Sequence, residues 1–260
     1  LENVCPGTYD LNKLESPEEC LDKCRALRDE PNFDVNGYYD TDTVECRIIH
    51  LANATNDPSH CGHGDFKSTD HCFPPPMEDP DCGEFCRMAM GICKDENQVY
   101  DDDETCLATC AALPLGSNLD KVENTVGCRH YHTFNSVPSP EIHCSHTGPT
   151  GAGHCGAIED GVGNCESYCI LAKAGCETLY ASTFSDDDDC RAQCAAIPGV
   201  ADDRETDGVN ETEQYSLALA ESGDPKFAFQ CRVLHATRAI VQGGEPATEC
   251  GAVFGLTACN

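Results

Sequence analysis

The stretch CRHYHTFNSVPSPEIHCSHTGPTGAGHC, residues 128–155, contains three cysteines and five histidines. A close copy, CRIIHLANATNDPSHCGHGDFKSTDHC, lies upstream at residues 46–72. A third copy at residues 231–259 begins with CRVLH but has no further histidine, and all ten histidines of the chain lie in these three segments. Because self-similarity along a chain is the signature of repeat architectures, the sequence predicts three tandem modules.

The cysteine pattern sets the predicted boundaries of these modules. The middle copy has eight cysteines, ordered as C-x3-C-x6-C, a second C-x3-C, the cysteine of CRxxH and two more. The third copy repeats all eight, whereas the first has six because it lacks the segment with the first C-x3-C pair. We predict module one at residues 1–75, module two at 76–158 and module three at 159–260, the last with a polar insertion near residues 199–224.

The spacing of apolar residues predicts short helices. One helical face at the start of module two is formed by Cys82, Phe85, Cys86, Ala89 and Cys93. A second helix is predicted at each later C-x3-C, where Ser16-Pro17-Glu18-Glu19 has the form of a capping box and acidic runs precede the other two copies. A third helix is predicted near each CRxxH. The predicted fold class is therefore small, disulfide-rich and mainly α, with long loops.

The cysteine content indicates an oxidising compartment. The chain has 22 cysteines in 260 residues and no C-x2-C pair, so a disulfide framework is favoured over cysteine zinc sites. The chain starts at Leu1 without a basic or apolar leader, which fits a mature product after removal of a signal peptide. No apolar run approaches the roughly 20 residues that span a bilayer. We expect a secreted, extracellular or cell-surface protein without membrane insertion.

The acidic composition argues against one class of partner. The formal net charge is -30, with 46 acidic and 16 basic residues. A charge of this size repels phosphate backbones, so we expect no nucleic-acid binding. The chain has no Trp and only 7% aromatic residues, so disulfides must supply stability that small apolar cores cannot.

The disulfide connectivity is only partly predictable. Facing C-x3-C helices predict an antiparallel hairpin with Cys82 paired to Cys110 and Cys86 to Cys106. For the loops, the shortest connections are favoured, and the residues assigned to such disulfides are Cys61 with Cys72, Cys144 with Cys155, and Cys250 with Cys259. The even number of cysteines in each module predicts that every module closes internally and that no thiol is left over.

The histidines are the candidate ligands for a metal ion. Neutral imidazoles gathered in a constrained loop suit Cu2+ or Zn2+. The candidate metal ligands are His50, His60, His63, His71, His132, His143, His146 and His154. The alternative interpretation is structural, with the rings donating hydrogen bonds to loop carbonyls. Module three retains only His235 and is expected to bind no metal.

Covalent haem is a weaker alternative. CRIIH, CRHYH and CRVLH place Cys and His as the outer residues of CxxCH do, but the second cysteine is replaced in all three copies. Using Cys46, Cys128 and Cys231 for thioethers would also leave an odd number of cysteines in each module. Among the candidate cofactors, we therefore rank haem below Cu and Zn.

Catalytic and modification motifs are few. The sequence has no G-x-S-x-G, P-loop or H-E-x-x-H pattern, and the even cysteine count leaves no predicted thiol nucleophile, so we expect a protein that is not an enzyme. Asn53-Ala54-Thr55 and Asn210-Glu211-Thr212 are N-glycosylation sequons, which matter only in a eukaryotic source.

The combined pattern resembles a known group of repeats. The C-x3-C-x6-C opening, the C-x3-C followed by Ala-Ala-Leu-Pro, NTVGCRHYH and HCSHTGPTGAGHCG are similar to cysteine-rich tandem repeats of uncharacterised secreted or lipoprotein-type bacterial proteins. The resemblance implies an extracellular repeat protein and no particular chemistry. Module three has ECGAVFGLTAC where module two has the histidine-rich end, so the resemblance is weakest there.

Two functions follow as expectations. The first is an extracellular, non-enzymatic structural protein that associates with itself. Because module one lacks a helix, the face which that helix covers in the other modules could receive another subunit head to tail, as in a surface appendage or filament. The second is a secreted metal- or haem-binding protein that uses the histidine clusters of modules one and two.

Overall fold

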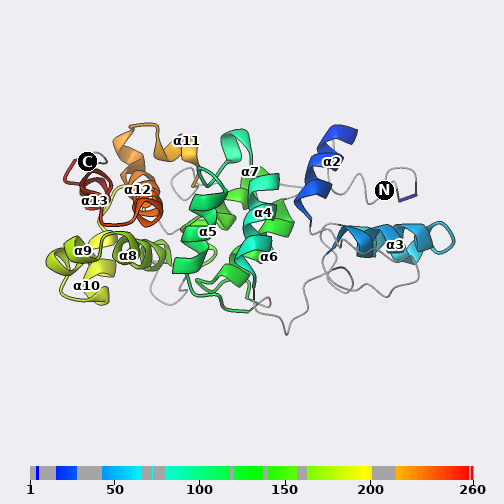
Figure 1. Ribbon diagram of the computed structural model, residues 1–260, viewed down its shortest axis with the longest axis horizontal. Helices are drawn as coiled ribbons and strands as arrows, with labels where there is room; N and C mark the ends of the chain where they lie inside the picture. Colours follow the sequence, from blue (N-terminus) through cyan, green and yellow to red (C-terminus); the bar gives the residue numbers. More distant parts are fainter. Residues whose placement is uncertain are drawn as a thin grey trace.

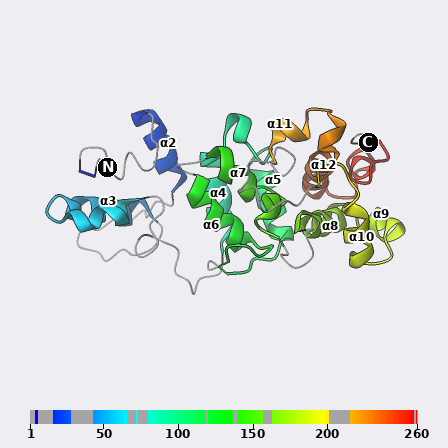
Figure 2. The same cartoon turned by 180° about the vertical axis from the view of Figure 1, so that it is seen from behind.

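The computed structural model describes residues 4–5, 16–27, 43–65, 72, 80–117, 120–136, 140–156, 163–200, 215–257 and 259. Within these ranges the secondary-structure elements are helices, which confirms the predicted disulfide-rich, mainly α class. Figures 1 and 2 show an elongated molecule whose helices follow one another along the long axis, from α3 (Val44–Ala54) near one end to α9 (Glu177–Thr183) near the other.

Module two opens with two helices, α4 (Cys82–Ile92) and α5 (Asp103–Ala112), which pack against each other. Phe85 and Ala89 of α4 are buried, as the predicted helical face requires. At the start of α5, the carboxylate of Asp102 accepts a hydrogen bond from the backbone N–H of Thr105. This cap satisfies one of the N–H groups that a helix start leaves without a partner. Then come α6 (Val126–Ser136), α7 (Pro140–Thr147) and the 3-10 turn η3 (Gly151–Gly153).

Module three repeats this order with additions. Its corresponding helices are α8 (Gly163–Gly175), α10 (Asp187–Cys194), α12 (Ala228–Gln242) and α13 (Ala247–Val253). Asp186 caps α10 by accepting a hydrogen bond from the N–H of Asp189. The sequence did not predict α13 or its counterpart α7 in module two, because this region was expected to be a looped cap. It also did not predict α9 or the short α11 (Leu217–Ala220), which lies within the expected insertion. The part of that insertion at residues 201–214 lies outside the described residues.

Module one contains α2 (Pro17–Ala26), α3 and the 3-10 helix η1 (Pro58–Gly64). The hydroxyl of Ser16 accepts a hydrogen bond from the N–H of Glu19, which confirms the predicted N-cap. Helix α2 packs on α4 of module two, and a Cβ at Gly91 would lie 2.3 Å from the Cβ of Ala26. Gly91 is therefore required for this close approach between the helices.

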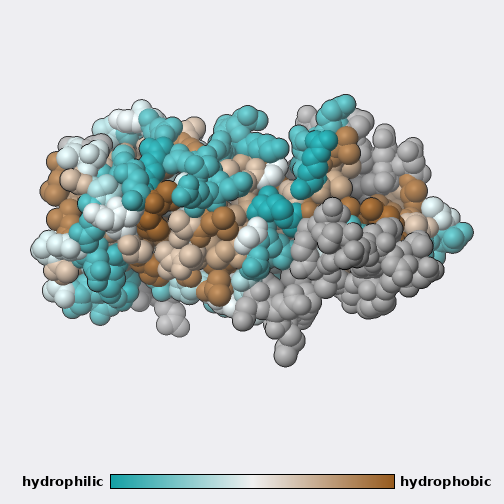
Figure 3. Space-filling model, viewed as in Figure 1, coloured by the Kyte–Doolittle hydropathy of each residue, from teal (hydrophilic) through white to brown (hydrophobic). Residues whose placement is uncertain are grey.

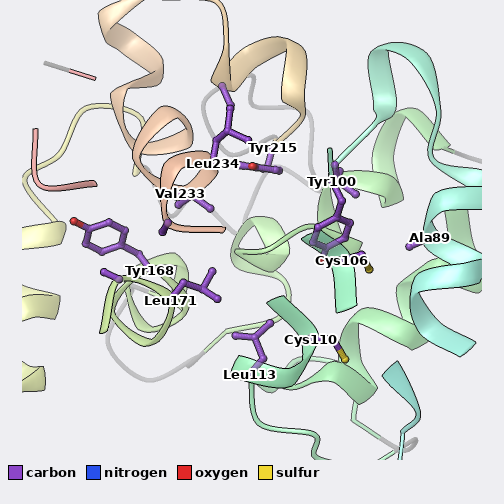
Figure 4. Close-up of a cluster of buried hydrophobic side chains, with 14 of the residues drawn as sticks. Ala89, Tyr100, Cys106, Cys110, Leu113, Tyr168, Leu171, Tyr215, Val233 and Leu234 are labelled. Carbon is purple, nitrogen blue, oxygen red and sulfur yellow. The ribbon is translucent and has the colours of Figure 1, made fainter. Parts of the chain in front are cut away.

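The apolar core is continuous between modules two and three. Figure 4 shows Leu113 at the end of α5, Leu171 of α8 and Val233 of α12 in one cluster of buried side chains. On the face shown in Figure 3, hydrophilic residues cover much of the described surface, and the main group of apolar residues lies left of the centre of the view. The predicted boundaries near residues 75 and 158 lie beside segments outside the described residues and stay predictions. Among the described helices, none has the length and apolar character needed to cross a bilayer.

Ten disulfides staple the helices together and connect 20 of the 22 cysteines. The predicted hairpin is confirmed, since Cys82 is bonded to Cys110 and Cys86 to Cys106. Module three repeats this crossing between α8 and α10 through Cys165–Cys194 and Cys169–Cys190.

The three short-loop pairings were wrong, although all six cysteines are in disulfides. The observed bonds are Cys5–Cys61, Cys46–Cys72, Cys93–Cys144, Cys128–Cys155, Cys176–Cys250 and Cys231–Cys259. In module two, Cys144 lies on α7, which packs against α4 and so brings it to Cys93. Cys155 instead ends a loop that returns to the start of α6. The packing of the helices, and not the length of the loop, decides the partner.

The expectation that no thiol is left over was also wrong. Cys20 and Cys24 of α2 are free and half-buried. They correspond to Cys106 and Cys110 of α5, whose partners lie on α4. Module one lacks the segment that would carry such partners, and its four other cysteines pair in the same way as their counterparts in module two.

Candidate metal centres

Four histidines of module two come from three neighbouring elements. His132 lies on α6, His143 and His146 lie on α7, and His154 follows η3. Disulfides fix each of these elements next to its histidines: Cys128–Cys155 joins the start of α6 to the residue after His154, and Cys93–Cys144 anchors α7 between His143 and His146. Disulfides between neighbouring cysteine side chains therefore hold together the elements that carry the rings.

The imidazole nitrogens of these histidines converge. The Nδ1 atom of His146 lies 3.3 Å from Nδ1 of His132 and 3.3 Å from Nδ1 of His143. The rings of His146 and His154 have their centroids 3.9 Å apart, and ligand atoms of His132, His146 and His154 all lie within 4.8 Å of one another. Four nitrogens placed tetrahedrally at about 2.0–2.1 Å from Zn2+ would be separated by about 3.3–3.4 Å. The two Nδ1–Nδ1 distances of 3.3 Å match two of the six edges of such a tetrahedron.

Hydrogen bonding alone does not account for this arrangement. A ring nitrogen carries either one proton or one in-plane lone pair, so Nδ1 of His146 can form a direct hydrogen bond with only one of its two neighbours. Among the described residues, the buried Nε2 atom of His146 has no hydrogen-bond partner. The Nε2 atom of His132 lies 3.4 Å from the carbonyl oxygen of Lys121, and donation to that oxygen leaves the lone pair on Nδ1. That lone pair faces the other rings.

The protonation state also suits a metal ligand. Burial, with the neighbouring His143 and His154, lowers the pKa of His132 from 6.5 to about 3. Burial, with His154 and His132 close by, lowers the pKa of His146 far below its ordinary value. Both rings are therefore neutral at pH 7, and a neutral imidazole is the form that binds metals.

The arginine of CRHYH holds the loop around the cluster. The Arg129 side chain is fully buried, and its hydrogen bonds within the described part of the chain are to neutral acceptors. It donates to the carbonyl oxygens of Thr125, Gly148 and Pro149, and to the side chains of Asn124 and Ser167. Gly148 and Pro149 lie between α7 and η3, so Arg129 fixes the segment that connects His146 to His154. Burial lowers the pKa of Arg129 to about 10, which leaves it charged at neutral pH.

Module one contains a second cluster of the same kind. The Nδ1 atom of His50, on α3, lies 3.1 Å from Nδ1 of His60 and 3.0 Å from Nδ1 of His63, both on η1. The ligand atoms of the three residues lie within 4.8 Å of one another. Arg47 donates to the carbonyl oxygens of Thr43 and Cys72, as its counterpart Arg129 does to its own loop. The candidate ligand His71 lies outside the described residues.

Module three keeps the frame but not the cluster. The Nδ1 atom of His235 lies 2.6 Å from the Oε2 atom of Glu249. Glu249 stands one residue before Cys250, as His143 stands one residue before Cys144. A carboxylate thus occupies the sequence position of a cluster histidine and pairs directly with the remaining ring. Alignment of the three copies in the sequence could have identified this replacement of a histidine by a glutamate.

Cysteine sulfurs also approach these histidines in all three modules. The groups are Cys46, His50 and Cys72; Cys128, His132 and Cys155; and Cys231, His235 and Cys259. Each pair of cysteines is a disulfide, so none provides the thiolate that a metal requires. The same bonds exclude thioether attachment of haem to Cys46, Cys128 or Cys231.

The remaining predicted sites are the two sequons. Asn53 is exposed in the last turn of α3, and Asn210 lies outside the described residues. His130, which we did not assign as a ligand, is buried with its ring 6.5 Å from that of Phe85. The first histidine of CRHYH therefore belongs to the core of the module.

Comparison with known proteins finds similarity over part of the chain. Residues 82–159 match the BfoA family C-terminal domain. Aurasperone B biosynthesis cluster protein A of Aspergillus niger is 39% identical over 72 residues, which are 27% of this chain and 24% of that protein. Bifonsecin B biosynthesis cluster protein A of Aspergillus brasiliensis is 38% identical over 72 residues, with the same coverage. An EGF-like domain-containing protein of Acanthamoeba polyphaga mimivirus is 32% identical over 93 residues, which are 32% of this chain and 17% of that protein.

These similarities extend over one module's length. The chain spans about a quarter of the length of the fungal relatives it matches, and the matched family domain covers 78 of the 260 residues (82–159). No solved structure gives a significant match. The relatives named here are fungal and viral, so they give no support to the expected bacterial source.

Proposed function

We propose that this chain is a secreted, non-enzymatic protein that binds a Cu2+ or Zn2+ ion in the histidine cluster of module two and another in that of module one. The observation that carries the proposal is the convergence of ring nitrogens at 3.3 Å in module two and 3.0–3.1 Å in module one. Imidazole nitrogens are suitable ligands for both ions. Ten disulfides support secretion, because such bonds persist in oxidising compartments.

The site in module two has the character of a structural or storage site. Four histidines are available there, and a tetrahedral ion that binds all four has no open position for a substrate. The ligands are also fixed by disulfides rather than by mobile loops. An ion would link α6, α7 and the segment after η3, and so complement the covalent frame. The structural role expected from the sequence, including head-to-tail assembly, stays a separate prediction.

Metal stoichiometry tests the proposal. We expect the metal-stripped full chain to bind two equivalents of Zn2+ or Cu2+ at pH 7.5, measured by isothermal titration calorimetry and by elemental analysis after desalting. His60→Ala with His63→Ala should remove one equivalent, because both residues are half-buried ligands of module one. His143→Ala should weaken the other equivalent by at least tenfold.

The matched control is His235→Ala, which removes the single histidine of module three and should leave two equivalents bound. Circular dichroism of each variant would verify that the helices remain. Failure of the wild-type chain to bind either ion at micromolar free concentration would contradict the proposal, and so would equal losses in the cluster variants and in the His235→Ala control.

A further inference from the structure

Helix α2 contains the only two thiols of the chain. Of the 22 cysteines, 20 are in disulfides, and Cys20 and Cys24 are free. They are separated by one helical turn, where Cβ atoms lie about 5–6 Å apart, and a disulfide needs a Cβ separation of about 3.5–4.5 Å. The pair therefore cannot close on itself without distorting the helix.

Helix α2 corresponds to α5 and α10 residue by residue. In each helix the first cysteine lies four residues after the N-cap and the second lies eight residues after it. The N-cap and cysteine positions are Ser16, Cys20 and Cys24 in α2; Asp102, Cys106 and Cys110 in α5; and Asp186, Cys190 and Cys194 in α10. The cap side chain accepts a hydrogen bond from the N–H three residues later in all three. The three helices are copies of one element.

The other two copies show what the cysteine pair binds. On α5 and α10 it meets a second C-x3-C pair on an antiparallel helix, with Cα–Cα distances of 5.7–6.1 Å across the four bonds. In every case the first cysteine of one helix joins the second cysteine of the other. This crossed connectivity is self-complementary, because two identical C-x3-C helices related by a two-fold axis would make the same two bonds.

We propose that α2 pairs with α2 of a second copy of this chain through two crossed disulfides, Cys20 to Cys24 of the partner subunit and Cys24 to Cys20 of the partner subunit. A second copy has no other thiols to offer. The two-fold arrangement uses both pairs completely and gives a closed dimer.

The position and charges of α2 fit this pairing. Ala26 faces α4, and the helical repeat places Cys20 and Cys24 roughly 120–160° around the helix from it. The first turn of α2 is acidic, with Glu18 and Glu19, and its last turn is basic, with Lys23 and Arg25. Within α2, Lys23 pairs with Glu19 and Arg25 pairs with Asp22, so these charges are already balanced before a partner helix arrives. At physiological ionic strength, screening over about 8 Å reduces the repulsion between two chains of net charge -30.

The bonds form by thiol–disulfide exchange with a small-molecule disulfide such as glutathione disulfide. A cysteine thiolate attacks the oxidant and releases one thiol, and the facing cysteine of the partner subunit then displaces the second thiol. For each new S–S bond, two cysteine thiols lose two protons and two electrons, and one oxidant disulfide is reduced to two thiols. Burial raises the pKa of Cys24, so exchange should be faster above neutral pH.

Intact mass and complementation test the proposal. The purified full chain is incubated with glutathione disulfide at physiological ionic strength and analysed without reductant. We expect a dimer of twice 28.0 kDa with no free thiol. Cys20→Ser alone and Cys24→Ser alone should each give at least a tenfold loss of covalent dimer, because each removes one partner from both bonds. A mixture of the two variants should regain it, because one crossed bond remains between unlike chains.

Other products would overturn the proposal. A monomer that retains two reactive thiols, carries glutathione adducts, or loses both thiols through a Cys20–Cys24 bond would do so. Dimer formed by either single variant on its own at the wild-type level would also do so, since it requires uncrossed pairing. The control is Leu21→Ser, a 53% exposed position on the same helix, which should dimerise as the wild type does. Metal binding is measured separately, so loss of one property does not affect the test of the other.

Discussion

Modules two and three share a covalent frame and differ in what it encloses. In both, the cysteine of CRxxH bonds to the last loop cysteine, and the cysteine that ends the first helix region bonds to the helix after CRxxH. In module two, His132 meets three further imidazoles, whereas His235 of module three meets the carboxylate of Glu249. The same frame thus holds either a set of converging nitrogens or a closed hydrogen-bonded pair.

This difference shows that the frame does not depend on the histidine cluster. The disulfides and helices of module three form with only one histidine present. The cluster in module two is therefore not needed to define the fold. The convergence of its nitrogen lone pairs needs an explanation other than folding. Metal binding provides one, because a cation satisfies all of the nitrogens at once.

The largest expected difference between the modules concerns their arginines. Arg129→Met should lower the free energy of unfolding by about 3–5 kcal/mol, because it leaves several buried carbonyl and side-chain acceptors without donors. Arg232→Met should lower it by about 1 kcal/mol, since Arg232 is half-buried and donates to the carbonyl of Cys259. Denaturant unfolding without reductant measures both values. Equal losses would mean that the arginines have the same role.

The next effect is the acid sensitivity of the metal-free cluster. The folded pKa of His132 is about 3, against 6.5 for the free group, so the unfolded chain binds more protons between these values. The contribution of His132 to the free energy of unfolding is fully present above about pH 6.5 and is lost as the pH decreases toward 3. At pH 4.5 the loss from His132 should be about 2–3 kcal/mol.

Comparison of two proteins isolates this contribution from the carboxylates that titrate in the same range. Unfolding in the presence of a chelator at pH 7.5 and pH 4.5 is measured for the wild type and for His132→Gln. The variant should show the smaller loss between the two conditions, whatever its stability at pH 7.5. Identical losses would show that His132 does not titrate in this way.

Local patterns in the sequence predicted the helix at each C-x3-C, the helix near CRxxH and the crossed hairpin of module two, but not α7, α9, α11 or α13. Helix caps and i, i+4 faces depend only on residues close together in the chain, so they can be predicted from sequence. Examples are the caps Ser16 and Asp102 and the spacing of Cys82 with Cys86. The four other disulfide partners in modules two and three depend on how α7 and α13 pack, which cysteine spacing does not encode. The free thiols of α2 were missed because an even count was taken to mean complete pairing.

The candidate site was predictable as a set of residues but not as a geometry. Repetition identified seven of the histidines that the structure describes, and it separated them from His130 and His235. It did not indicate which nitrogens converge, since this depends on the Arg129 contacts and on the Cys128–Cys155 bond. It also gave Glu249 no role, because the pair it forms with His235 is visible only when α12 and α13 are packed together.

The smallest expected effect distinguishes Glu249, which pairs with His235, from His143, the proposed metal ligand at the corresponding sequence position of module two. Glu249→Gln should lower the free energy of unfolding by about 1–2 kcal/mol, because it weakens a charge-assisted hydrogen bond to His235. Since no ion is involved, the loss should be the same in chelator and in saturating Zn2+.

His143→Gln should instead lower the free energy of unfolding more in Zn2+ than in chelator, because a weakened site loses stabilisation in proportion to the logarithm of its affinity change. A tenfold weaker site corresponds to about 1.4 kcal/mol at saturating ion. If the loss for His143→Gln were equally independent of Zn2+, the two positions would be equivalent and the cluster of module two would be structural, as the His235–Glu249 pair is.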